Sequence, residues 1–320
     1  MKNRLLLAAL FVAICCLSSC INNGSTGELI EDTSQQQNND SLETLRSQYD
    51  FDEKYFTFYD DGVLTFSSDY TFDSGTPRLN INLGIPSTYM GAKIKEFRVK
   101  NGHAYCPFPK VFVDDGIQSV RFGSTGVLEN LCLPKTIKEI ELNHSPNLKT
   151  VHLAEGVTEI SANSFYSCES LTTVTIPNSV TTIGSSAFWY CISLTSINIP
   201  DNLLSIGERA FEGCHQLSKI VLGQRVQRVE SMAFNDCCEY CSFVVIPASV
   251  TYIGDSAFGY LDNNYSSYPN IYYKGNKEQW LNIEGKNGFS RLDIVYFYSE
   301  SEPTESGNYW HYVKGQPTVW

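Results

Sequence analysis

The chain has 320 residues, of which 42% are hydrophobic, 13% aromatic and 18% charged, and its formal net charge is −12. This apolar and aromatic content excludes disorder over the whole length and is enough for a large core. The acidic balance excludes a general nucleic-acid binder, which needs a basic face, so no nucleic-acid partner is expected.

The N-terminus has the pattern of an export signal. Lys2 and Arg4 precede an apolar run over residues 5–17, shorter than the ~20 residues that span a bilayer. The run ends in Leu-Ser-Ser-Cys, which resembles a bacterial lipobox. We predict a signal peptide over residues 1–19 and lipidation of Cys20, with the lipid as the membrane partner. A plain signal peptide and an uncleaved anchor are the alternatives.

The residue after Cys20 is Ile21 rather than an acidic inner-membrane retention signal, which favours the outer membrane, with exposure at the cell surface left open. Residues 20–48 are rich in Gln, Asn and acidic side chains and cannot bury enough surface to fold. We expect a flexible tether there.

Residues 49–127 are aromatic and favour strands, as in the segment 55–59. The segments 94–99 and 117–122 resemble degenerate repeat strands. We expect a β-rich N-terminal cap that merges into irregular early coils, because an open solenoid end would expose apolar surface and unpaired strands.

From residue 128 onward the chain repeats itself with a period close to 23 residues. Successive spacings are 20, 23, 23, 23 and 24, and the repeated position holds Leu128, Leu148, Leu171, Leu194, Leu217 and Cys241. Phenylalanines recur in step at Phe165, Phe188, Phe211, Phe234 and Phe258. A fixed period in the twenties predicts a stacked solenoid in which each coil covers the apolar face of its neighbour.

One coil shows how the repeat is expected to fold. Leu171, Val174 and Ile176 alternate with threonines and are predicted to point inward from a short strand. Gly184 is expected to permit a turn that side chains resist. Phe188 follows on a predicted short helical turn and stacks on the equivalent phenylalanine of the next coil.

The repeat unit, L-T-x-I-x-I-P-x-S-V-T-x-I-G-x-x-A-F-x-x-C, resembles the BspA-like class of bacterial leucine-rich repeats over roughly residues 128–261. The resemblance implies an α/β solenoid, mostly β, over residues 128–262. It also implies a surface protein that adheres to host matrix proteins or other cells. Residues 263–320 resemble the aromatic C-terminal cap that often ends such chains. In the fourth coil Gly223 replaces the proline and Glu230 the glycine, which predicts a bulged or looser coil.

Four cysteines share one repeat position, namely Cys168, Cys191, Cys214 and Cys237. The period already explains them, so we expect a ladder of small buried thiols rather than a metal row or a set of disulfides. Cys238 is the extra thiol of a C-x-x-C spacing, and a disulfide involving it is the expected deviation.

No pattern in the chain indicates catalysis. The histidines have no zinc-binding spacing, and no nucleophile elbow, P-loop or dinucleotide fingerprint occurs. Acidic pairs such as Asp114–Asp115, or Glu300 with Glu302, are expected to be solvated surface groups. We therefore predict no catalytic residue, no metal and no cofactor, with a carboxylate-dependent hydrolase as the weakest alternative.

The solvent side of the repeat strands is the candidate binding surface. It begins polar and turns apolar toward the C-terminus, where coverage by the C-terminal cap is the favoured expectation. Trp189 lies in the variable part of its coil, as an exposed anchor or as packing between coils. The candidate residues are His152, Thr173, Thr175, Trp189, Ser196, Asn198, Lys219, Val221, Phe243 and Val245.

Together these patterns predict a monomeric, non-catalytic binding or adhesion protein of the cell envelope. Its partner would be a host matrix protein, another cell or a glycan, recognised through the solenoid surface. A structural envelope protein without a soluble ligand is the alternative.

Overall fold

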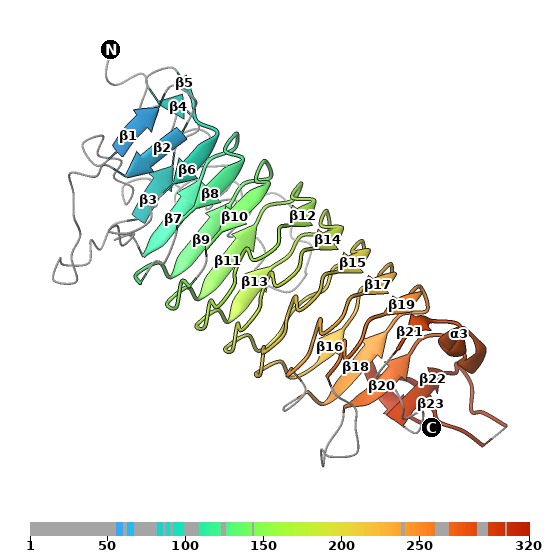
Figure 1. Cartoon of the computed structure of the whole chain (residues 1–320). Helices are drawn as coiled ribbons and strands as arrows, with labels where there is room; N and C mark the ends of the chain where they lie inside the picture. The colour runs from blue at the N-terminus through green and yellow to red at the C-terminus, as the bar shows by residue number, and fades with distance from the viewer. Residues whose placement is uncertain are drawn as a thin grey trace, which may run out of the picture. The chain divides into compact units, whose positions relative to one another are not determined.

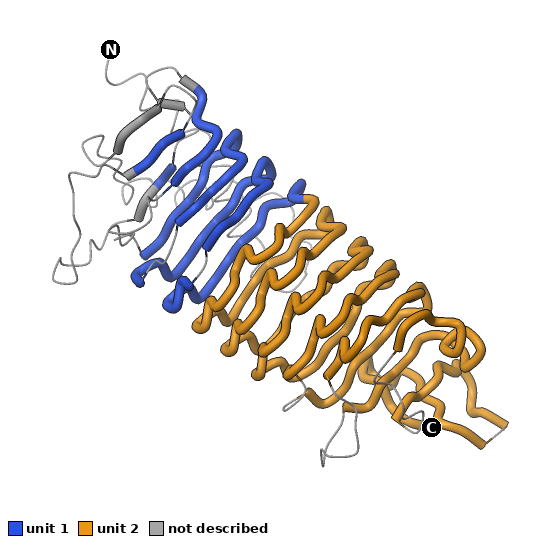
Figure 2. Tube along the Cα trace, in the orientation of Figure 1, with its two compact units in different colours: residues 1–157 blue, residues 158–320 orange. Residues whose placement is uncertain are grey.

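The computed structural model describes residues 56–59, 63–66, 82–85, 88–89, 92–98, 109–122, 126–142, 144–237, 241–259, 269–286, 294–304 and 306–320. The chain divides into two compact units, residues 1–157 and residues 158–320 (Figure 2). The predicted signal peptide, Cys20, the tether and Cys238 lie outside the described residues. Within the described part of the chain, no helix is long and apolar enough to cross a membrane.

The first unit is built of coils, and its strands form two separate ladders, to each of which a coil supplies one strand (Figure 1). One ladder has the order β1 (Phe56–Tyr59), β2 (Val63–Phe66), β6 (Glu96–Arg98), β8 (Ser119–Arg121) and β10 (Glu139–Glu141). The other has β3 (Asn82–Ile85), β7 (Lys110–Val113), β9 (Asn130–Leu133) and β11 (Thr150–Leu153). All neighbours pair in parallel except the β1–β2 hairpin.

The core of this unit lies between its ladders, where alternate side chains such as Val111, Leu131 and Val120 are buried. The two segments that resemble degenerate repeat strands form β6 and β8, which pair in parallel register. A separate short hairpin joins β4 (Thr88–Tyr89) to β5 (Ala92–Lys93).

The second unit also has two ladders. One is entirely parallel, in the order β12 (Glu159–Ile160), β14 (Thr182–Ile183), β15 (Ser205–Ile206), β17 (Arg228–Val229), β19 (Tyr252–Ile253) and β21 (Glu284–Gly285). The other runs β16 (Ile220–Val221), β18 (Phe243–Ile246), β20 (Asn270–Tyr273), β22 (Val295–Tyr298), β23 (Tyr309–Val313) and β24 (Gln316–Val319). It ends in the antiparallel pair β23–β24.

Among the described residues of this unit, the remaining regular elements are β13 (Thr173–Thr175) and one short helix, α3 (Lys277–Leu281). Asn276 caps α3 with a capping box. The Asn276 side chain accepts from the backbone N–H of Gln279, and the Gln279 side chain accepts from the backbone N–H of Asn276. The segment around Phe188 forms turns rather than the expected helical turn. The fold is therefore a β-solenoid with very little helix, as the repeat predicts.

The five repeat phenylalanines are fully buried and stack in one column inside the second unit, which confirms the central prediction. Successive ring centroids are 5.2, 5.1, 5.1 and 5.5 Å apart, with interplanar angles of 17° or less. The backbone reinforces the column, since the N–H of Phe188 donates to Ala210 O and the N–H of Phe211 donates to Ala233 O.

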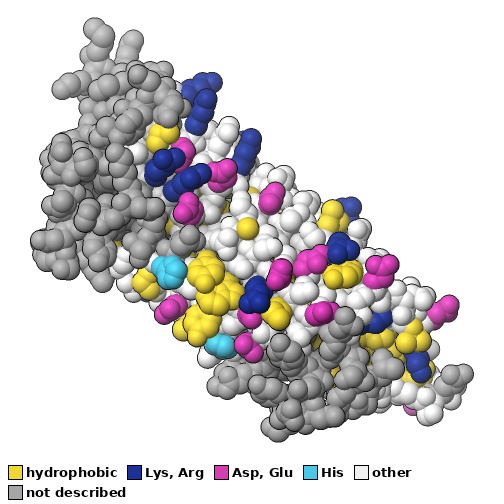
Figure 3. Space-filling view, in the orientation of Figure 1, with side chains coloured by type: hydrophobic (Ala, Val, Ile, Leu, Met, Phe, Trp, Pro, Cys, Tyr) yellow, Lys and Arg dark blue, Asp and Glu magenta, His cyan; other side chains and the backbone are white. Residues whose placement is uncertain are grey.

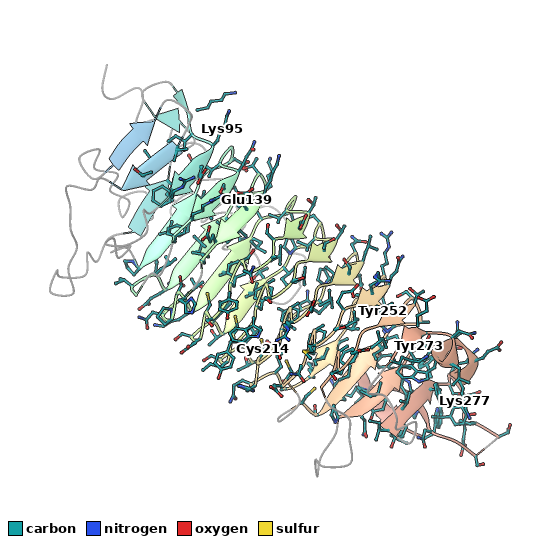
Figure 4. The ribbon with its side chains drawn as sticks, in the orientation of Figure 1. Lys95, Glu139, Cys214, Tyr252, Tyr273 and Lys277 are labelled. Carbon is teal, nitrogen blue, oxygen red and sulfur yellow. The ribbon has the colours of Figure 1, made fainter. Side chains whose placement is uncertain are left out.

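The four repeat cysteines are fully buried, as expected, and no described cysteine is in a disulfide. Each of three thiols donates to the carbonyl of the preceding coil's phenylalanine, as in Cys214 Sγ to Phe188 O at 3.3 Å (Figure 4). Burial raises the pKa of the Cys191 and Cys214 thiols well above their usual range, because a thiolate would lose its hydration there.

The repeat glycine serves close approach between coils rather than the expected turn. A Cβ on Gly184 would lie 2.5 Å from the backbone nitrogen of Ala162, and one on Gly207 would lie 2.6 Å from the backbone of Gly184. The left-handed residue of each turn comes two positions later and is not glycine, as at Ser186 with φ 54° and Arg209 with φ 57°.

The fourth coil is not bulged, so that expectation is wrong. The Glu230 N–H donates to Ile206 O at 2.9 Å, against 2.8 Å for the equivalent bond from Gly207 to Ile183 O. At the missing proline, Gly223 approaches so closely that a Cβ would lie 2.1 Å from Pro200 O. The coil therefore stays in register, and at the position of the missing proline the backbone of Gly223 contacts the backbone of Pro200 in the preceding coil.

One predicted strand does not form. Residues 194–200, which repeat the sequence of β13, contain no strand, although Leu194 and Ile199 remain buried. Serine and asparagine replace the outward threonines there, and asparagine is a poor strand former. Two of the three inward positions thus keep their packing, whereas Ile197, which corresponds to the buried Val174, is only half-buried.

Candidate binding surface

The outward ladder of the second unit is a shallow, mostly polar surface. Thr173 is exposed and Thr175 half-buried on β13, whereas Ser196 and Asn198 are exposed outside any strand. Lys219, which precedes β16, is exposed, and Val221, on β16, is 36% exposed. The set offers hydroxyls, an amide and one ammonium group.

His152 belongs to the first unit and lies on β11, in register with Cys132 of β9. It is half-buried, and its Nε2 is a buried atom that has no hydrogen-bond partner among the described residues.

Val245 is not part of an exposed surface, which corrects its place among the candidates. It is 1% exposed and packs with Tyr272 and Trp310 in a buried cluster, and the half-buried Phe243 packs against that cluster. Aromatic side chains of the last strands cover this part of the ladder, because an open apolar row would otherwise face water.

Trp189 lies on an aromatic edge formed by Tyr166, Trp189, Tyr190 and His215. The Trp189 ring stacks on Tyr166, with centroids 4.5 Å apart, and on Tyr190 at 5.1 Å. His215 contacts Tyr190 edge-on at 5.8 Å. Trp189 is half-buried and Tyr190 is 40% exposed, so the tryptophan both packs between coils and contributes to the surface.

Glu212 holds the aromatic edge in place. Its carboxylate accepts from Trp189 Nε1 at 3.1 Å, from Arg209 Nη1 at 3.1 Å and from Asn235 Nδ2 at 3.0 Å. A carboxylate with three donors fixes the indole and leaves the aromatic edge rigid before any ligand arrives.

Sequence reasoning found Trp189 but missed the other three members of the aromatic edge. Tyr166 follows a repeat phenylalanine as Trp189 does, and His215 follows a repeat cysteine, so these variable positions occupy the same edge of successive coils. The signal that could have found them is the presence of aromatic side chains at equivalent variable positions of successive coils. This signal indicates a shared edge only when the register of the coils is known.

The acidic pairs are only in part the solvated surface groups that the sequence predicts. Glu300 and Glu302 are exposed and Asp115 Oδ2 is 3.3 Å from Lys135 Nζ, but Asp114 is 5% exposed, so the expectation is wrong for that residue. Among the described residues, no group of three or more His, Cys, Asp or Glu side chains could hold a metal ion. Acidic and basic side chains are scattered over the face that Figure 3 shows, and hydrophobic side chains are visible on it at several places.

Residues 135–265 match the family model described as the BspA type leucine rich repeat region, in six copies. No curated protein matches the chain.

Solved structures with low identity resemble it. A leucine rich cell surface protein from Faecalibacterium prausnitzii is 22% identical, with 65% of this chain and 73% of that chain covered and a TM-score of 0.35. The T. pallidum leucine rich repeat protein is 20% identical, with coverages of 66% and 86% and a TM-score of 0.42. The pneumococcal vaccine antigen PcpA is 15% identical, with coverages of 77% and 91% and a TM-score of 0.37.

Proposed function

Starting from a chain whose residues 135–265 are BspA-type leucine-rich repeats, we propose a non-catalytic binding protein of the bacterial cell surface. Its partner is a host matrix protein, another cell or a glycan, recognised on the outside of the coils. The observation that carries this proposal is the aromatic edge, which presents Tyr190 on a fixed platform.

Rigid aromatic side chains beside polar groups are typical of binding hot spots, because they bury large area at little entropic cost. Glu212 already holds Trp189 in one position, so a partner would not have to order the indole. Thr173 and Asn198 supply further exposed polar groups on the outward side of the same unit. This combination favours recognition over a purely structural role.

We further propose that the protein is an outer-membrane lipoprotein, anchored through Cys20 after removal of residues 1–19. The basic head, the short apolar run and the Leu-Ser-Ser-Cys sequence support this location. The polar residues 20–48 would then hold the coils away from the lipid.

Replacing Cys20 by alanine is expected to release the protein from the membrane fraction. The thiol is the atom that carries the lipid, and one apolar run of this length does not anchor a chain stably. Membrane and soluble fractions of bacteria expressing either form, compared by immunoblot, provide the measurement. Ser19→Ala, which keeps a small residue beside the thiol, is the control. Equal membrane retention of Cys20→Ala would overturn the anchor.

Replacing Tyr190 by alanine is expected to weaken binding of a partner about tenfold, as loss of a hot-spot aromatic costs more than 1 kcal/mol. The lipid-free Cys20→Ala protein is screened on arrays of matrix proteins and glycans, and affinities of the hits are measured by surface plasmon resonance. Leu281→Ala removes another exposed apolar side chain, which lies on α3 and is 57% exposed against 40% for Tyr190, and serves as control. Hits bound equally by all three forms, or the absence of any hit, would contradict this function.

A further inference from the structure

A pocket of about 370 Å³ lies at the carboxyl ends of the last strands of the second unit. Each of several neighbouring coils contributes to it directly after a strand. Pro247 follows β18, Lys274 follows β20 and Tyr298 is the last residue of β22. The full lining is Gln224, Pro247, Ala248, Ser249, Lys274, Tyr298 and Tyr312.

The lining carries one cation and no carboxylate, in a chain whose net charge is −12. The Lys274 ammonium lies 5.6 Å from the centre of the Tyr312 ring, in a cation–π contact. It forms no ion pair with any residue in the described part of the chain. A half-buried ammonium group in the pocket lining, without a counter-charge among the described residues, favours an anionic ligand.

Two tyrosines form a firm wall beside this cation. Tyr298 and Tyr312 have ring centroids 6.3 Å apart, and both pack edge-on or tilted against Trp310. Trp310 is itself buried, and its Nε1 donates to Tyr273 O at 3.0 Å. Because this support is fixed, the 41% exposed Tyr312 ring presents a preformed flat face.

The remaining lining is suited to a polyhydroxylated ligand. The Gln224 side chain is exposed, with donors and an acceptor, while its backbone N–H is already bonded to Asp201 Oδ1 at 3.0 Å. The Ser249 hydroxyl donates to backbone carbonyls of the preceding coil at 2.7–2.8 Å, so only its lone pairs remain for a ligand. Pro247 and Ala248 add apolar surface.

We propose that this pocket binds the acidic sugar residue of a glycan, with the carboxylate on Lys274 and the apolar face of the sugar ring against Tyr312. The volume is at the small end of the range of ~300–1,000 Å³ for small-molecule pockets, which favours a short ring compound over an extended acidic peptide. The site is separate from the aromatic edge, and the proposal stands even if that edge binds nothing.

The test is calorimetric titration of the lipid-free Cys20→Ala protein with trigalacturonate at low salt. Binding is expected, with a loss of at least tenfold in affinity for Lys274→Met, which keeps the apolar stem of the side chain and removes its charge. Lys277→Met changes a neighbouring exposed lysine on α3 and is expected to leave the affinity unchanged (Figure 4). The methyl-esterified trimer is expected to bind wild type no better than the acid binds Lys274→Met.

A second variant separates stacking from charge. Tyr312→Ala is expected to weaken trigalacturonate binding while the protein stays folded with a modestly lower melting temperature, because Tyr312 is 41% exposed and packs against Trp310 from the surface. Equal affinity in wild type and Lys274→Met, or no binding by the folded protein, would overturn the proposal. So would a triglutamate peptide that binds in a Lys274-dependent manner while the sugar does not.

Discussion

Replacing Phe211 by alanine is expected to lower the free energy of unfolding by ~3–5 kcal/mol. Phe211 is fully buried at the centre of the phenylalanine column, and its ring lies 5.1 Å from both Phe188 and Phe234. Its removal leaves a cavity that neither neighbour can fill, because their backbones are hydrogen-bonded to adjacent coils. Chemical denaturation followed by circular dichroism gives the measurement.

Two further variants make this result specific. Phe211→Leu keeps much of the volume and is expected to cost less than the alanine change. Thr173→Ala alters an exposed position of the same unit and is expected to change stability by no more than about 0.5 kcal/mol. If Phe211→Ala unfolds at the same denaturant concentration as wild type, the column does not stabilise the coils.

Replacing Trp310 by alanine is expected to cost a similar ~3–5 kcal/mol. The indole is fully buried, covers Val245 and Tyr272, and satisfies the Tyr273 carbonyl through its Nε1. Its loss would therefore leave a large cavity, remove the hydrogen-bond donor of the buried Tyr273 carbonyl and expose the side chains of Val245 and Tyr272 to water. Thermal unfolding and binding of a dye for exposed apolar surface give two readouts.

The matched control is Trp320→Ala. This tryptophan is 43% exposed, its ring packs on His311 with centroids 3.8 Å apart, and its Nε1 donates to Ser299 O at 3.2 Å, so we expect a smaller loss of about 1 kcal/mol. If the Trp310→Ala and Trp320→Ala proteins have the same melting temperature and bind the same amount of dye, the last strands do not shield the apolar side chains of the ladder from water.

The inward half of each coil could be predicted because one physical rule controls it. Phe188, Cys191 and Leu194 recur with the period, and a recurring apolar residue in a stack of coils has only the interior to occupy. The same rule explains why Leu194 and Ile199 are buried even where no strand forms between them.

The outward half could not be predicted as well, because each exposed position depends on what its neighbours in space supply. The alternation of the strand places Val245 outward, yet Trp310, far along the chain, covers it. Trp189 was recognised by its type alone, whereas its role depends on Tyr166 of the preceding coil and on Glu212 of the next. The Lys274 pocket was missed because its lining comes from five strand ends scattered over the sequence.

The glycine was placed correctly for the wrong reason. Its position after Ile183 suggested backbone freedom, but the φ values assign that freedom to Ser186. A Cβ on Gly184 would lie 2.5 Å from the backbone of the coil before it, although the fourth coil accommodates Glu230 at the equivalent position. A single coil holds no information about that distance, which exists only between coils.

The buried thiols also bear on chemical stability, because the proposed location at the cell surface is an oxidising one. Free cysteines are a hazard under oxidising conditions, since an oxidant can join two thiols, or a thiolate can attack an existing disulfide and displace its other sulfur, and either reaction can cross-link chains wrongly. Burial of Cys191 and Cys214 withholds the reactive anion from solvent, so the finished coils are chemically quiet. These thiols are then accessible to oxidation only between synthesis of the chain and packing of the coils. Rapid folding of each coil onto its neighbour would shorten that interval.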